Sequence, residues 1–105
     1  EIMKPEGAAL WIRMNPTQRE FLKMLGDIQE ECVQPARCRR ESASLEDALY
    51  DGTSDVIIRI LEAVDGYRKS GPRLRIVREE TGEGLKEHPF IELHDAVCAY
   101  LKGVE

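Results

Sequence analysis

The stretch that decides the fold is TSDVIIRILEAVDGYR, residues 53–68. In a helix with about 100° between successive residues, its apolar side chains share an arc of roughly 160°. They are Val56, Ile57, Ile60, Leu61, Ala63, Val64 and Tyr67. An arc this wide is more than one neighbouring helix can cover. The sequence therefore predicts a central helix that starts at a Thr53 or Ser54 cap and packs on two sides.

A second helix is expected to begin after Asn15. Asn15 is a good N-cap residue, Pro16 suits the first helical position, and Gln18 completes a capping box. The apolar face of this helix consists of Phe21, Leu25, Ile28 and Cys32. Because the residue before a proline disfavours helical geometry, Pro35 is expected to end the helix at about Gln34. Residues 35–43 are then expected to form a loop.

A short third helix is expected between these two. Ser44 is its expected N-cap, with Asp47 three residues later, and Gly52 is expected to end it. A fourth helix is expected to begin at Pro89 and to end at Gly103. Its predicted buried stripe consists of Phe90, Leu93, Val97, Tyr100 and Leu101.

The rest of the pattern favours short strands. Leu74 and Ile76 alternate with arginines, residues 81–84 contain two turn-forming glycines, and residues 85–87 could return as a partner strand. Residues 8–14 could add a third, N-terminal strand. We therefore expect one α+β domain over residues 8–105, with about four helices and a short antiparallel β-hairpin, preceded by a flexible tail at residues 1–7.

Composition excludes several function classes. The 105 residues carry a formal net charge of −5, which argues against bulk attraction to nucleic acid or to a membrane surface. No apolar run is long enough to span a bilayer. The three cysteines are odd in number and irregularly spaced, which indicates reduced thiols and a cytoplasmic location.

No group of residues reaches the standard of a catalytic, cofactor or metal site. His94 and Cys98 lie four residues apart and could reach one ion, but Cys32 and Cys38 make a poor second pair for zinc. Residues 51–55 lack most of the ligands of a calcium loop. The expected protein is therefore not an enzyme and carries no cofactor or metal. A small enzyme or ligand- or metal-binding domain that uses His94, Cys98 and nearby arginines is the alternative.

Basic residues gather near the predicted hairpin. Arg68, Arg73, Arg75 and Arg78 form a possible patch for an anion or an acidic partner. Phosphate or nucleic-acid binding through Arg73, Arg75 and Arg78 is a further alternative. The carboxylates at residues 41–55 could instead block a basic partner, as an inhibitor or immunity-type protein does.

Two isoleucines lie among polar neighbours. Ile58 shares the polar side of the central helix, and Ile91 lies at the rim of the last helix. Exposed aliphatic residues on charged faces can mark a contact with another chain. The sequence therefore favours a non-enzymatic protein–protein interaction domain, as a homodimer or as a subunit of a larger assembly.

Overall fold

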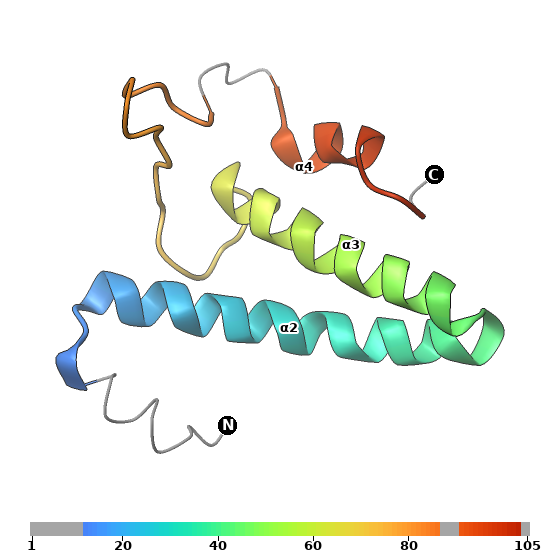
Figure 1. Ribbon diagram of the computed structural model, residues 1–105. Coiled ribbons are helices and arrows are strands. Elements are labelled where there is room, and N and C mark those ends of the chain that lie inside the picture. The colour runs from blue at the N-terminus through green and yellow to red at the C-terminus, as the bar shows by residue number, and fades with distance from the viewer. Residues whose placement is uncertain (1–11, 87–90, 104–105) are drawn as a thin grey trace.

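Two long antiparallel helices form the body of the protein (Figure 1). The computed structural model describes residues 12–86 and 91–103. Helix α2 spans Pro16–Ser42 and helix α3 spans Leu45–Val64, followed by the short α4 (Leu93–Ala96) and a 3-10 turn, η1 (Val97–Ala99). Helix α3 contacts α2 on one side and α4 on the other, so it is the central element.

The expected α+β fold is wrong, because the described part of the chain is mostly helical and contains no strand. Its β-structure is limited to one isolated antiparallel bridge between Val77 and Gly84. Ile76, Val77 and Leu85 remain exposed beside this bridge. An isolated two-stranded hairpin is marginal unless a third strand or a helix covers its apolar face, and within the described residues neither buries Ile76, Val77 or Leu85. The alternation at residues 73–77 therefore produces an extended segment.

The predicted N-terminal strand is not formed by its described residues either. Ile12 and Arg13 have helical geometry. Residues 8–11 of the predicted strand lie outside the described residues, and so does the predicted tail at residues 1–7. The assignment of residues 8–105 to one domain stays a prediction.

The start of α2 is confirmed and its predicted end is wrong. The side-chain carbonyl of Asn15 accepts a hydrogen bond from the backbone amide of Gln18 at 2.8 Å. Oε1 of Gln18 in turn accepts one from the backbone amide of Asn15 at 2.9 Å. Helix α2 then continues through Pro35 to Ser42, so residues 35–42 are helical. Proline removes one internal hydrogen bond. After Pro35 the helix is favoured by its packing against α3. It is also favoured by the two arginines of its last turn, Arg39 and Arg40, which interact well with the helix dipole.

Helix α3 merges the two helices expected around Gly52. Its Ser44 cap is confirmed, since Ser44 Oγ accepts from the Asp47 amide at 3.1 Å. Gly52 does not end it, and α3 continues to Val64. A Cβ built on Gly52 would lie 3.4 Å from Cβ of Ala36, so α2 and α3 are in contact at this position. The Thr53 hydroxyl donates to the Leu49 carbonyl at 2.7 Å instead of capping a new helix.

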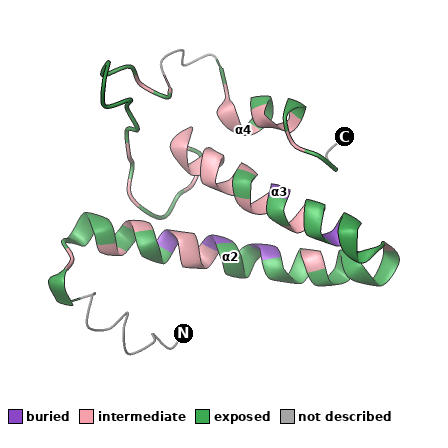
Figure 2. Cartoon of the chain, viewed as in Figure 1, coloured by how far each residue is buried: buried purple, intermediate pink, exposed green. Residues whose placement is uncertain are grey.

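The core is one narrow seam between α2 and α3 (Figure 2). Its buried hydrophobic residues in the described ranges are Met24, Ile28, Cys32 and Ala48. Half-buried side chains from both helices pack against this seam; they are Phe21, Leu25, Val56, Ile60 and Ala63. Most other hydrophobic side chains of the two helices are left half-buried or exposed.

The last helix is shorter than expected. Pro89 and Phe90 lie outside the described residues, and α4 begins at Leu93. Tyr100 is exposed, so its place in the predicted buried stripe is wrong, whereas Leu93, Val97 and Leu101 are half-buried. None of the helices in the described ranges combines the length and the apolar character needed to cross a membrane.

Candidate functional site

A polar cluster around Asp65 joins the end of α3 to α4. Asp65 is the C-cap residue of α3, and its side chain is 0% exposed. Its carboxylate accepts from Lys86 Nζ at 2.7 Å and from the His94 backbone amide at 3.0 Å, and it lies 2.5 Å from His94 Nδ1. One buried carboxylate therefore connects the end of α3 to two segments that are distant in the sequence, the one around Lys86 and α4.

The ammonium group of Lys86 fills the centre of this cluster. Besides Asp65, it donates to Glu92 Oε2 at 2.9 Å and to the Ile91 carbonyl at 2.7 Å. Ligand atoms of Asp65, Glu92 and His94 lie within 4.8 Å of one another, a spacing that could hold a metal ion. However, the lysine places its own positive charge among these same oxygens, so the carboxylates are already neutralised from within the chain.

The cluster shifts the pKa values of its members. Burial by itself would raise the pKa of Asp65, but hydrogen bonds from Lys86 and from the backbone and ring of His94 lower it to about 2. The hydrogen bond to Asp65 raises the pKa of His94 above its usual value. Both shifts favour a charged pair, Asp65⁻ with His94⁺.

His94 and Cys98 do not form a nucleophile and base. The Cys98 thiol donates to the backbone carbonyl of His94 at 3.8 Å, and the imidazole uses Nδ1 for Asp65. The His94 ring also packs on the Tyr67 ring, with centroids 4.7 Å apart. The imidazole therefore has a structural partner on one nitrogen and a ring on its face, and the thiol is not directed at it.

Sequence reasoning missed Asp65 because its partners are 21 and 29 residues away. One signal was present. An acidic residue at a helix C-terminus opposes the helix dipole, so it needs a compensating cation. The sequence alone does not show which cation compensates it, because Lys86 and His94 are distant along the chain.

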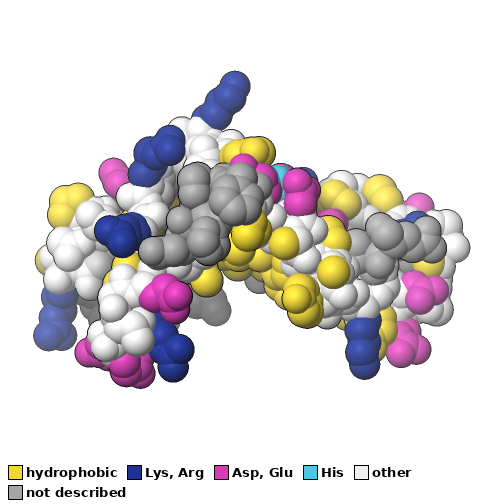
Figure 3. Space-filling model, turned by 90° about the horizontal axis from the view of Figure 1, so that it is seen from above, with side chains coloured by type: hydrophobic (Ala, Val, Ile, Leu, Met, Phe, Trp, Pro, Cys, Tyr) yellow, Lys and Arg dark blue, Asp and Glu magenta, His cyan; other side chains and the backbone are white. Residues whose placement is uncertain are grey.

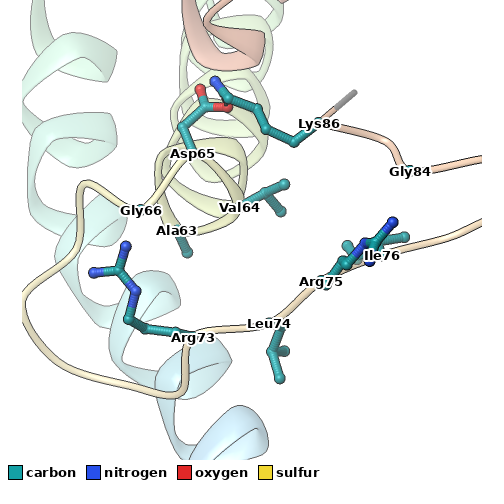
Figure 4. Close-up of a pocket in the computed structure, with 10 residues that line it drawn as sticks. All are labelled: Ala63, Val64, Asp65, Gly66, Arg73, Leu74, Arg75, Ile76, Gly84 and Lys86. Atoms are coloured by element: carbon teal, nitrogen blue, oxygen red, sulfur yellow. Dashed lines mark hydrogen bonds and ion pairs between the residues drawn. The ribbon is translucent and has the colours of Figure 1, made fainter. Parts of the chain in front are cut away.

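The four arginines of the predicted anion patch do not converge on one place. Arg68 makes two hydrogen bonds to the Glu31 carboxylate, both 2.9 Å, and so joins α2 to the end of α3. Arg78 pairs with Glu80 at 3.4 Å. Arg73 and Arg75 line a pocket of about 410 Å³, but their side chains extend in different directions (Figure 4). An anion bound there would not meet both guanidinium groups at once.

The acidic stretch and the cysteines also have structural placements. Residues 51–55 lie within α3, and Asp51 pairs with Arg39 Nε at 2.5 Å. Cys32 is buried in the core seam, Cys38 is exposed on α2, and Cys98 is intermediate. All three are free thiols.

An apolar groove of about 650 Å³ runs between α2 and α3. Its apolar lining includes Val33 and Ala36 from α2 and Leu49, Val56 and Ile57 from α3. Leu49 is 59% exposed and Val33 is 45% exposed, and Leu45 at the start of α3 is 57% exposed. Hydrophobic side chains also gather near the middle of the face seen from above, on the side of the molecule where α4 lies, beside acidic and histidine side chains (Figure 3).

The two isoleucines of the predicted interface lie outside this groove. Ile58 is half-buried on α3, one turn after the buried Ser54 and two turns before Asp65, on the side of the helix that carries the contacts to α4. Ile91 is exposed, and its carbonyl accepts from Lys86. Their role as an interface stays a prediction.

In the part of the chain that the structure describes, the apolar groove and the polar Asp65 cluster are thus the candidate sites. Comparison of the chain with models of protein families, with curated proteins and with solved structures finds no significant match.

Proposed function

We propose that this chain is a non-enzymatic protein–protein interaction domain that binds its partner through the groove between α2 and α3. The observation that carries the proposal is the groove itself, about 650 Å³ in volume and lined by Val33, Leu49 and Ile57, each more than a third exposed. Exposed hydrophobic side chains that gather on one surface mark protein contacts more often than single ones do.

The small core supports the same proposal. Among the described residues, only four hydrophobic side chains are buried. Small cores leave a fold marginally stable, and full burial of one Val, Leu or Ile side chain is worth about 1.5–3 kcal/mol. A partner in the groove would cover several such side chains at once and would add to the stability of both helices.

The polar cluster gives an enzyme less support. Its carboxylate, ammonium and imidazole groups are directed at one another, and each already has a hydrogen-bond partner from the same chain. The inhibitor reading based on residues 41–55 is also less favoured, because Arg37, Arg39 and Arg40 lie at the same end of the helix pair and offset those carboxylates.

We place the domain in a reducing compartment, the cytoplasm. The support is chemical: Cys32, Cys38 and Cys98 are all free, and the exposed Cys38 would be open to oxidation in a secreted protein.

Photo-crosslinking tests the proposed function. A photoreactive phenylalanine analogue is placed at position 49 in the groove or, as a matched control, at position 76, where Ile76 is 45% exposed on the extended segment. In cells that express the chain, we expect protein adducts from position 49 and few from position 76. A folded chain that gives no protein adduct from position 49 would refute the proposal.

A further inference from the structure

We propose that the partner in this groove is a second copy of the same chain, an inference that rests on the proposed function. Two helix pairs would pack face to face about a two-fold axis parallel to the helices and form a four-helix bundle. A two-fold interface uses the same surface on both copies, so that surface has to be complementary to itself. Shape, charge and area of the α2–α3 face meet this requirement.

The shape of the face is self-complementary. Small residues, Ala36 and Gly52, form the floor of the groove, where a Cβ built on Gly52 would lie 3.4 Å from Cβ of Ala36. Leu49 and Leu45 project beside this floor and are more than half exposed. The face therefore carries both projecting leucines and the shallow apolar floor that could receive the leucines of another copy.

Beyond the apolar residues of this face, toward the turn between α2 and α3, lie unpaired charges of both signs. Arg40 follows Ala36 by one turn of α2, and Glu46 precedes Leu49 by about one turn of α3. Among the described residues, no ion pair involves Arg37, Arg40, Glu46 or Asp47. A rim of one sign would repel its own copy, whereas a rim of both signs can pair with it.

The proposed axis brings these charges together. Ala36 lies level with Gly52 along the helix pair, which places Arg40 within one turn of Glu46 and Asp47 along the same direction. Rotation about an axis parallel to the helices lays α2 of one copy over α3 of the other at the same level. Arg40 of each copy then faces Glu46 of the second copy, at the edge of the groove.

The same arrangement makes each α2 antiparallel to two helices. It already runs antiparallel to its own α3 (Figure 1), and it would run antiparallel to α3 of the second copy. Antiparallel neighbours place opposite ends of helix dipoles together, as in up-and-down bundles. A two-fold axis across the helices would instead place α2 on α2 and would leave Arg40 away from the acidic residues.

The area of the face is at the low end of the range for stable complexes. Helix α3 has 20 residues, so it is about 30 Å long, and two adjacent helices of about 10 Å diameter present a face of about 600 Å². Each partner in a stable complex contributes about 800 Å² on average. The extra length of α2 and the projecting leucines bring the face toward that size.

The mass of the purified full chain tests the inference. Sedimentation equilibrium at up to about 100 µM should give twice the 12.0 kDa of one chain, with monomer appearing on dilution. Leu49→Glu and, separately, Leu45→Glu should give monomer, because each places a charge in the apolar interface. Ile76→Glu is the matched control and should stay dimeric. Far-UV circular dichroism shows that each variant is helical.

A charge exchange tests the proposed axis. Arg40→Glu and Glu46→Arg should each weaken the dimer by about threefold to tenfold, and the double variant should recover to within about twofold. If the losses of dimer affinity in the two single variants simply add in the double variant, this axis is contradicted.

Failure of the inference differs from failure of the proposed function. If the chain is monomeric at 100 µM and position 49 crosslinks to a different protein in cells, the proposal of a homodimer is wrong. The proposal of an interaction domain then still holds. A monomeric chain with no adduct at position 49 overturns both.

Discussion

At the scale of single residues, Asp65 holds the C-terminal part of the chain to α3. Its carboxylate is shielded from solvent, lies at the unfavourable end of a helix dipole, and is compensated by Lys86 and His94. The cost of burying this charge is offset only while both partners remain. The stability of the contact between α3 and α4 should therefore depend on pH.

Stability should be greatest between about pH 4 and pH 6.5. The pKa of Asp65 falls from 3.8 to about 2 in the folded chain, so its contribution is complete above pH 3.8 and is lost as the pH falls toward 2. The pKa of His94 is raised above 6.5, so its contribution is complete below pH 6.5 and is lost as the pH rises through the folded value. Urea denaturation at a series of pH values measures both limbs. Asp65→Asn should lower the free energy of unfolding by about 2–3 kcal/mol near pH 5 and remove most of its dependence on pH at both ends of this range. An unchanged pH dependence in this variant would show that the Asp65–His94 pair does not contribute to stability.

Gly71 is the second residue whose replacement should be costly. Its φ is +91°, and a Cβ there would lie 2.7 Å from Sδ of the buried Met24. Gly71→Ala should lower the free energy of unfolding by about 1–3 kcal/mol through backbone strain and displacement of the core. Gly82→Ala is the matched control, because Gly82 also has a positive φ but has open space around it. Equal losses in the two variants would mean that contact with Met24 is not the cause.

At the scale of elements, the sequence predicts two helix starts correctly, whereas the start expected at Thr53 or Ser54 is wrong because α3 continues through it. The caps at Asn15 and Ser44 are local arrangements within four residues, and both are confirmed. The stops expected at Pro35 and Gly52 are wrong, because contact between α2 and α3 outweighs local preference at both positions. The hairpin expected near Leu74 and Ile76 is wrong for the opposite reason, since the described helices and the single bridge leave Ile76 and Val77 exposed.

Removal of the proline tests the continuity of α2. Pro35 lies inside the helix and lacks the amide that would bond to the carbonyl four residues earlier. Pro35→Ala should therefore raise the free energy of unfolding by about 1–3 kcal/mol, measured by urea denaturation, and leave helix content unchanged or higher. If residues 35–43 were a loop, the same change would loosen the unfolded chain and leave stability equal or lower.

Thiol reactivity reports the same element from its two faces. Cys38 is exposed and should react with a thiol reagent at a rate close to that of a free thiol. Cys32 is buried in the seam, and burial raises its pKa, so it should react slowly and only when α2 and α3 separate. Mass spectrometry of timed samples measures both rates. Equal rates in the folded protein would contradict the placement of α2 against α3.

At the scale of the whole molecule, the candidate sites could not be read from the sequence because each depends on distant segments. The groove needs Val33 of α2 and Leu49 of α3 side by side, and the polar cluster needs Asp65 beside His94. The sequence-based search for exposed aliphatic residues instead selected Ile58 and Ile91, because it looked for apolar residues among polar neighbours within single predicted helices. The expectation of an interaction domain remains, now proposed on a different surface.

Side-chain labelling in expressing cells tests most directly whether the groove is covered by another chain. Leu49 and Leu45 are 59% and 57% exposed in the isolated chain, and Ile76 is 45% exposed. If a partner covers the groove, hydroxyl-radical oxidation should be slower at the two leucines than at Ile76, and Val33→Glu should raise oxidation of Leu49 severalfold by displacing the partner. Leucines that are oxidised at least as fast as Ile76, and whose oxidation Val33→Glu does not change, would contradict the proposal that this face binds a protein.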